Sequence, residues 1–128
     1  MKVYITCPAS HTKKRLKLLP IIEKVVKSKG IESFVFKIGG EPKDIFKRDL
    51  SALRSNDILI AEVSERSHGV GIEIGLSYLL GLKRILLIEK GNFVTKLAQG
   101  MPDTIIIEYL GEEGLRNKLG KVLDKLGQ

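Results

Sequence analysis

The sequence of 128 residues has no tryptophan, a single cysteine and no long apolar run. The one cysteine, Cys7, cannot form an internal disulfide bond, which favours a reducing compartment. The apolar runs are far shorter than the ~20 residues that cross a bilayer. Pro8 and polar residues follow the first apolar stretch too closely for a signal peptide. These absences argue against a membrane protein and predict a cytoplasmic one.

Aromatic residues are also scarce, at 5% of the chain, although the net charge is +7. The basic residues gather in the stretches HTKKRLK and EKVVKSKG, which is compatible with an anionic partner. Proteins that stack single-stranded bases interleave basic and aromatic side chains, and this sequence lacks that pattern. The charge therefore indicates a solvated basic helix or attraction of a small phosphorylated ligand, and argues against nucleic acid.

Strand and helix patterns alternate along the chain. Several strand segments are continuously apolar, as expected when both faces of a parallel sheet are covered. We predict one domain over residues 1–128, a three-layer α/β fold of Rossmann/flavodoxin-like type with a five-stranded parallel sheet in the order 2-1-3-4-5. The predicted strands are residues 2–6, 33–38, 57–63, 84–89 and 104–109, and the predicted helices are 13–29, 41–55, 70–82 and 112–126, with 93–100 as a short helical or loop segment.

Ligands of open parallel sheets bind beyond the carboxyl ends of the strands. Among the loops at those ends, SERSHGVG is the richest in polar residues and glycine. Gly69 and Gly71 lie where this loop joins a predicted helix, whose N–H groups and dipole attract phosphate or carboxylate. The third glycine and the later acid of a dinucleotide fingerprint are missing. We therefore predict an anion site and no nicotinamide or other cofactor.

One carboxylate, Glu73, stands among the apolar residues of the same helix. We interpret it as a first-turn acid whose pKa the helix dipole keeps low. An ionised carboxylate is a suitable nucleophile toward a sugar carbon, as in retaining glycoside cleavage. The alternative is a favourable first-turn acid exposed to water. The apolar neighbours Val70, Ile72 and Ile74 favour partial burial, which an acid without a function seldom has.

Glycosidic cleavage also needs a group that protonates or hydrogen-bonds the leaving base. Asp49, in the helix before the third strand, could face the same cleft or remain an exposed helix acid. Glu62, near the carboxyl end of that strand, is a weaker candidate, because it could simply bind a backbone group or a basic side chain. Asp57 lies at the amino end of the sheet, which excludes it from the site.

The remaining reactive residue types form no recognisable centre. His11 and His68 have no cysteine or carboxylate at ligand spacing, so no metal site is predicted. Cys7 ends a strand before a helix, where thiolates can be activated, but no local signature ties it to a histidine. We interpret it as a small core residue.

The stretch SNDILIAEVSERSHGVGIEIGLSYLLGLKRILLI resembles the central segment of the nucleoside 2-deoxyribosyltransferase superfamily. It is most similar to the 2'-deoxynucleoside 5'-monophosphate N-hydrolase branch, through a strand ending in A-E-V, a polar loop, G-V-G-x-E-x-G and a K-x-I-L strand. The order of elements matches over nearly the whole chain, and the specific likeness covers residues 49–100.

The resemblance implies a role for individual residues. It makes Glu73 the nucleophile that attacks C1' of the sugar, with Asp49 and Tyr4 assisting at the site. In the hydrolases a serine of the partner subunit completes the phosphate site, which implies a homodimer; alignment on Gly100 places Thr95 there, and alignment on the preceding strand places Ala98. The residues assigned to substrate binding are Ser67, Gly69, Gly71, Thr95 and Ser10.

The first loop, CPASHTKKR, departs from the family. Cys7 replaces a glycine of the phosphate loop, and Lys13, Lys14 and Arg15 follow; cationic side chains can replace backbone donors in holding phosphate. The sequence-based hypothesis is a hydrolase of the N-glycosidic bond of (deoxy)nucleoside 5'-monophosphates that works through a Glu73 glycosyl-enzyme intermediate. The alternatives are a nucleoside 2-deoxyribosyltransferase and a non-catalytic nucleotide-binding module.

Overall fold

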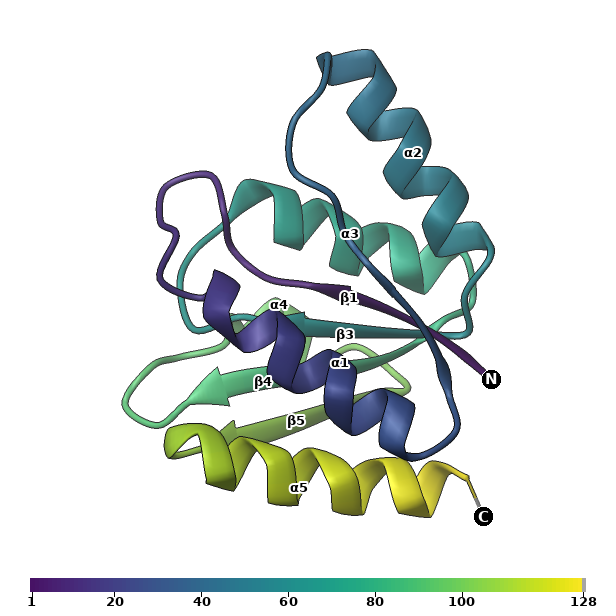
Figure 1. The fold of residues 1–128 in the computed structure, drawn as a ribbon. Helices are drawn as coiled ribbons and strands as arrows, with labels where there is room; N and C mark the ends of the chain where they lie inside the picture. Colours follow the sequence, from purple (N-terminus) through teal and green to yellow (C-terminus); the bar gives the residue numbers. More distant parts are fainter. Residues whose placement is uncertain (128) are drawn as a thin grey trace.

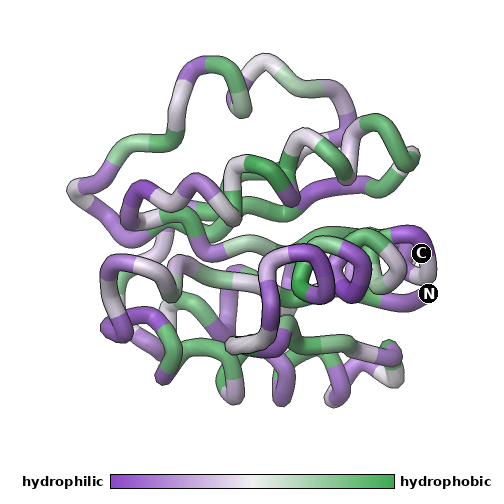
Figure 2. The backbone as a smooth tube through the Cα atoms, turned by 90° about the horizontal axis from the view of Figure 1, so that it is seen from above, coloured by the Kyte–Doolittle hydropathy of each residue, from purple (hydrophilic) through white to green (hydrophobic). Residues whose placement is uncertain are grey.

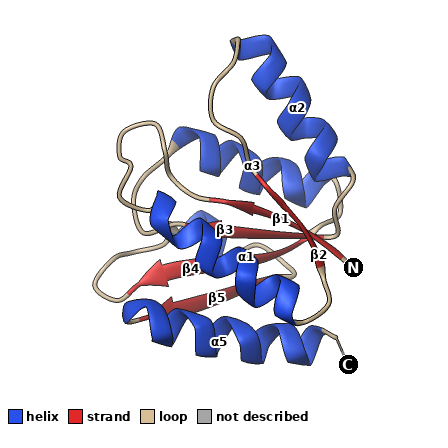
Figure 3. Cartoon of the chain, viewed as in Figure 1, coloured by secondary structure: helices blue, strands red, loops and turns tan. Residues whose placement is uncertain are grey.

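The computed structural model describes residues 1–127, which form a five-stranded parallel sheet between two layers of helices (Figures 1 and 3). The strands run in the order β2-β1-β3-β4-β5, and every neighbouring pair is parallel. This confirms the predicted fold class and strand order. The strands are β1 (Lys2–Thr6), β2 (Glu32–Val35), β3 (Ile58–Glu62), β4 (Lys83–Glu89) and β5 (Thr104–Tyr109).

The helices divide between the two faces of the sheet, with α1 and α5 together on one side and α3 on the other (Figure 1). Alternate residues of a strand point to opposite faces, so in β3 Ile60 packs with the α1 and α5 layer and Leu59 with the other. None of the helices in residues 1–127 is both long and apolar enough to cross a membrane. The helices are the 3₁₀ turn η1 (Leu16–Leu18), α1 (Leu19–Ser28), α2 (Pro42–Arg54), α3 (His68–Leu79), α4 (Lys96–Gln99) and α5 (Gly111–Leu126).

The hydropathy of the residues along the chain explains why the helices pack against the sheet. Hydrophobic and hydrophilic positions alternate along the helices (Figure 2), as expected for elements with one face on a core and one in water. The α1 and α5 layer contributes apolar side chains at helical spacing, Ile22 and Val26 from α1 and Leu115 and Leu119 from α5. The other layer combines α3 with α2, through Leu53, and with the four-residue α4, through Ala98.

Several predicted boundaries were wrong, three of them near the candidate site. The first helix begins at Leu19 and not at residue 13, with Pro20 in its first turn, where proline is tolerated. The third helix begins at His68, because the Ser67 side chain caps it by accepting a hydrogen bond from the Val70 N–H at 3.2 Å. Strand β2 ends at Val35, three residues earlier than predicted.

Candidate active site

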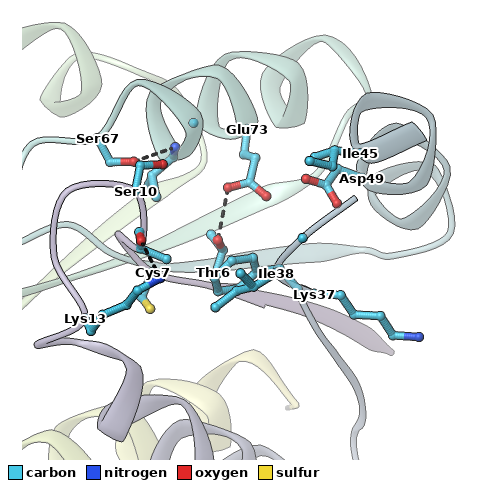
Figure 4. A pocket seen from close by; sticks show the side chains of 15 residues that line it. Thr6, Cys7, Ser10, Lys13, Lys37, Ile38, Ile45, Asp49, Ser67 and Glu73 are labelled. Atoms are coloured by element: carbon cyan, nitrogen blue, oxygen red, sulfur yellow. Dashed lines mark hydrogen bonds between the residues drawn. The ribbon is translucent and has the colours of Figure 1, made fainter. Parts of the chain in front are cut away.

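A cavity of about 360 Å³ lies beyond the carboxyl ends of β1 and β2, between α2 and the start of α3 (Figure 4). This is where ligands of doubly wound sheets bind. Its lining includes Thr6, Cys7, Ser10 and Lys13 from the end of β1 and the loop after it, Phe36 to Gly39 after β2, Ile45 and Asp49 of α2, and Ser67, Gly69, Val70 and Glu73 around the start of α3.

Glu73 is the centre of the cavity's hydrogen bonds. Its side chain is almost fully buried, with 7% exposure, and both carboxyl oxygens are engaged by β1. The Tyr4 hydroxyl donates to Oε2, and the Thr6 hydroxyl donates to Oε1 at 3.0 Å. Tyr4 and Thr6 are two apart on one strand, so both point to the face that α3 covers. The carboxyl group is therefore held from the sheet while one side remains open to the cavity.

Burial raises the pKa of Glu73 from its ordinary value of 4.5 to about 7. The hydrogen bonds from Tyr4 and Thr6 lower it in part, and the charge of Asp49 raises it. The sequence-based expectation of a low pKa was wrong for two reasons. The helix begins at His68, so Glu73 is in its second turn, beyond the reach of the terminal dipole. The cost of burying the charge then exceeds what the two hydrogen bonds recover.

Asp49 projects from α2 into the same cavity, opposite the start of α3 (Figure 4). Burial raises the pKa of its carboxyl group, and the neighbouring Arg48 guanidinium opposes that rise. The charge of Asp49 raises the pKa of both Tyr4 and Glu73. The two carboxyl groups therefore influence each other's ionisation. Two acids that are far apart in sequence thus meet at one cavity.

The start of α3 differs from the prediction in one respect. Ser67 and Gly69 line the cavity, and Ser67 accepts at Oγ from Val70, which leaves its own hydroxyl proton free to donate. The Gly71 N–H, however, donates to the Ser67 carbonyl at 3.1 Å within the helix. Gly71 lines a different cavity, so its N–H is not a donor to a ligand beside Glu73.

The loop after β1 brings one of its three consecutive basic residues to the cavity. Lys13 lines it, together with Ser10, whereas Lys14 is exposed elsewhere. Arg15 is buried and forms ion pairs with Glu65 at 2.8 Å and Glu89 at 3.4 Å. Arg15 therefore fixes the loop and does not face the cavity.

Cys7 is buried on the cavity wall, and burial raises the pKa of its thiol to about 12. The negative charges of Glu62 and Glu73 contribute to this rise in pKa. A thiol with such a pKa stays protonated near neutral pH and is a poor nucleophile. This agrees with the interpretation of Cys7 as a packed residue.

Thr95 lies apart from Glu73 within one chain. It caps α4 by accepting at Oγ from the Leu97 N–H at 3.4 Å. It lines a neighbouring cavity of about 250 Å³, with His68, Gly71 and Ala98. Thr95 does not line the Glu73 cavity of its own chain.

The rival acids have structural partners. Glu62 is fully buried and accepts hydrogen bonds from the Ser64 N–H at 2.7 Å, the Ser64 hydroxyl at 2.6 Å and the Tyr109 hydroxyl. Asp57 accepts from the Lys2 N–H at 2.8 Å, at the amino end of the sheet as predicted. Among residues 1–127, no three His, Cys, Asp or Glu side chains gather as a metal site would require.

Sequence reasoning missed three parts of the cavity lining. Thr6 could have been found, because it follows Tyr4 at the strand period of two and must share its face. Lys13 lay within the basic cluster, but nothing in the sequence separated it from Lys14. The segment after Phe36 was predicted as strand up to Ile38 and is instead a wall of the cavity.

Several known proteins are similar to this chain in sequence or in fold. A protein of Thermofilum pendens assigned as 2'-deoxynucleoside 5'-phosphate N-hydrolase 1 is 38% identical over 112 residues, 79% of this chain and 78% of that protein. The structure of a Clostridium botulinum CMP N-glycosidase superposes with a TM-score of 0.70 at 27% identity, covering 93% of this chain and 98% of that one. No protein-family model matches the sequence.

A 2-deoxyribosyltransferase of Bacillus psychrosaccharolyticus also has a TM-score of 0.70, at 19% identity over 91% of both chains, which shows a shared fold. The fold and these relatives define a protein of the nucleoside 2-deoxyribosyltransferase superfamily. Within that superfamily, the chain belongs to the 2'-deoxynucleoside 5'-phosphate N-hydrolase family.

Proposed function

We propose that this protein hydrolyses the N-glycosidic bond of (deoxy)nucleoside 5'-monophosphates to a free base and a sugar 5-phosphate. The observation that carries the proposal is the buried Glu73 carboxyl, held by Tyr4 and Thr6 and open to a cavity that Asp49 shares. Membership in the N-hydrolase family and the likeness to a CMP N-glycosidase support the substrate class.

The reaction proceeds in two steps in this proposal. A Glu73 carboxylate oxygen attacks C1' of the sugar, the C1'–N bond breaks, and its electron pair leaves with the base, which Asp49 assists by donating a proton or hydrogen bond. Water then attacks C1', releases the sugar 5-phosphate and restores the carboxylate. Since the pKa of Glu73 is about 7, the ionised form that attacks prevails only above neutral pH. The Tyr4 hydroxyl orients the carboxylate.

Incubation of the purified protein with a panel of ribo- and deoxyribonucleoside 5'-monophosphates, with chromatographic detection of free base, tests this function. Release of base from at least one nucleotide is expected, and release from none of them contradicts the proposal. A second free base added to the reaction identifies a transferase by the exchanged nucleoside that it makes. Thermal stabilisation by nucleotides without turnover identifies a binding module.

The phosphate is proposed to lie where Ser10, Lys13 and Ser67 line the cavity, on the opposite side of Glu73 from Asp49 and Ile45 (Figure 4). Ser67 and Gly69 offer donors at a helix start, which favours an anion. Lys13 adds a positive charge, and its Nζ contacts the Ala9 carbonyl at 3.3 Å, so the ammonium can turn to a phosphate at the cost of one exposed hydrogen bond.

Replacing Lys13 with glutamine is expected to raise the KM for a nucleoside 5'-monophosphate about tenfold, since a hydrogen bond to a charged group contributes roughly 1.5–3 kcal/mol. The kcat/KM for the same nucleoside without phosphate should change less than about twofold. Lys14→Gln is the matched control, because Lys14 carries the same charge one residue on and does not line the cavity. An equal loss for both substrates would show that Lys13 does not bind phosphate.

We propose further that the protein is a homodimer in which the Thr95 region of one protomer completes the cavity of the other. Helix α3 is apolar on both sides: Val70 and Ile74 pack on the sheet, while Ile72 and Leu79 are 58% and 78% exposed. Next to it, Leu97 of α4 is 83% exposed. Exposed apolar surface of this kind favours association.

Sedimentation of the wild-type protein is expected to give about twice the 14.2 kDa mass of the chain. Ile72→Glu, which places a charge on the outward face of α3, should shift the mass to that of one chain and reduce base release. Leu110→Glu changes an equally apolar residue that is 71% exposed just before α5, and it should leave the mass unchanged. A wild-type protein that sediments as a single chain contradicts the dimer.

A further inference from the structure

Residues 37–40, named here the wall segment, form one side of the cavity but are weakly attached to the rest of the chain. Lys37, Ile38 and Gly39 line the cavity. The last backbone anchor before them is the Phe36 N–H, which donates to the Ile5 carbonyl at 3.0 Å. The wall segment contains two glycines with positive φ, Gly39 at +92° and Gly40 at +120°, which lets the chain turn away from the sheet.

One side chain holds this segment. Arg48 of α2 donates from Nη2 to the Lys37 carbonyl at 2.6 Å and from Nη1 to the Gly39 carbonyl at 3.2 Å. Within residues 1–127, these two are the only hydrogen bonds that reach the wall segment. A guanidinium suits this task, since its planar fork can reach two acceptors at once.

The same guanidinium faces the candidate acid. Arg48 Nε lies 3.6 Å from Asp49 Oδ1, and both atoms are buried without a hydrogen-bond partner. Buried polar atoms in native proteins are nearly always paired, so each of these two atoms depends on the charge of the other. The contact is longer than a hydrogen bond, but it ties Asp49 Oδ1 to the guanidinium, so Arg48 sets the orientation of a carboxyl group that lines the cavity.

We propose that Arg48 is a positioning residue, which fixes the wall segment as one side of the cavity and holds the Asp49 carboxyl group toward the substrate. The inference rests on the proposed function and extends it to the part of the site that meets the base. Ile38 of the wall segment and Ile45 of α2 flank the space beside Asp49. A base bound in this space contacts the wall segment, whose hydrogen bonds come from Arg48.

The charge of Arg48 has a second effect. Asp49 faces Arg48 on its own helix, the Tyr4 hydroxyl on β1 and the Glu73 carboxyl on α3, and the Lys37 side chain lines the same cavity. Burial raises the pKa of Asp49, and Arg48 is the group that opposes this rise. Removal of the guanidinium therefore moves the pKa of Asp49 upward.

The test compares Arg48→Gln with Lys47→Gln, which removes the same charge one residue earlier from an exposed side chain that does not line the cavity. Arg48→Gln is expected to lower kcat/KM about tenfold, because hydrogen bonds to a charged group are lost. One limb of the pH profile should be absent in Asp49→Asn, and in Arg48→Gln this limb should shift to higher pH. Arg48→Lys, which keeps the charge and loses the fork, should restore the position of that limb but only part of kcat/KM.

A second readout does not depend on activity. Trypsin cleavage after Lys37 under native conditions is monitored by mass spectrometry. It should be severalfold faster in Arg48→Gln than in Lys47→Gln, because a wall segment without its hydrogen bonds to Arg48 opens more often. Cleavage rates and kinetics that match those of Lys47→Gln overturn the proposal. If the wild-type protein releases no base from any nucleotide, the proposed function fails, and the cleavage rates still decide whether Arg48 holds the wall. If Arg48→Gln does not fold, Arg48→Lys takes its place in the comparison of kcat/KM and in the cleavage measurement, because it also loses the planar fork.

Discussion

Replacement of Glu73 with glutamine is expected to abolish base release from nucleoside 5'-monophosphates, with a loss of roughly a thousandfold or more. An amide cannot form the ester bond to C1', while its size and one of the two oxygens that accept from Tyr4 and Thr6 are retained; its NH2 group can donate to the other hydroxyl. The measurement is single-turnover release of base at excess enzyme, which separates the chemical step from substrate binding.

Two further measurements show whether the loss is chemical. Glu73→Gln should still be stabilised thermally by the nucleotides that the wild type cleaves, because the groups proposed to hold the phosphate are unchanged. Asp49→Asn should lose about a hundredfold, the scale of general acid catalysis. Full base release by Glu73→Gln or Glu73→Ala would exclude Glu73 as the nucleophile.

The buried Glu73 carboxyl group is expected to make the protein less stable as the pH rises from about 4.5 to about 7. Below this window the group is protonated in both the folded and the unfolded chain. Within it the unfolded chain loses the proton while the folded protein keeps it, because burial raises the pKa from 4.5 to about 7. The folded state then binds more protons, so the free energy of unfolding falls with pH, by roughly 3 kcal/mol in total.

Glu73→Gln isolates this effect, since the amide does not titrate. Urea unfolding of both proteins between pH 4 and 8 should show a stability gain of the variant over the wild type that grows with pH and levels off above about 7. Glu112→Gln, an exposed carboxyl group on α5 on the other face of the sheet, is the control. A gain that is constant with pH would mean that Glu73 titrates alike in both states.

Much of the fold could be read from the sequence, because it depends on local patterns. The continuous apolar runs of the central strands and the alternation with helices define a parallel sheet with both faces covered, and the structure confirms it. Glu73 stood out as a carboxylate in a glycine-rich helix start, and the family resemblance pointed to Asp49.

What escaped prediction depends on three-dimensional surroundings. The pKa of Glu73 reflects burial by β1, which spacing along α3 does not reveal. The Gly71 N–H donates to the Ser67 carbonyl, because the capped helix begins two residues earlier than predicted. The hold of Arg48 on the wall segment joins residues nine and eleven positions apart through a loop that was predicted as strand. The first and third errors came from contacts that no local pattern encodes, whereas the Ser67 cap is a local signal that was not used.

The two hydroxyl groups that hold Glu73 come from β1, which has β2 on one side and β3 on the other. Lys13 and the wall segment belong to loops after the first two strands. Strands inside a sheet exchange and open far less readily than loops. The proposed function thus assigns bond breaking and substrate choice to separate parts of the chain, and it predicts that mutation of the two loops changes the preferred nucleotide while the groups that hold Glu73 are retained.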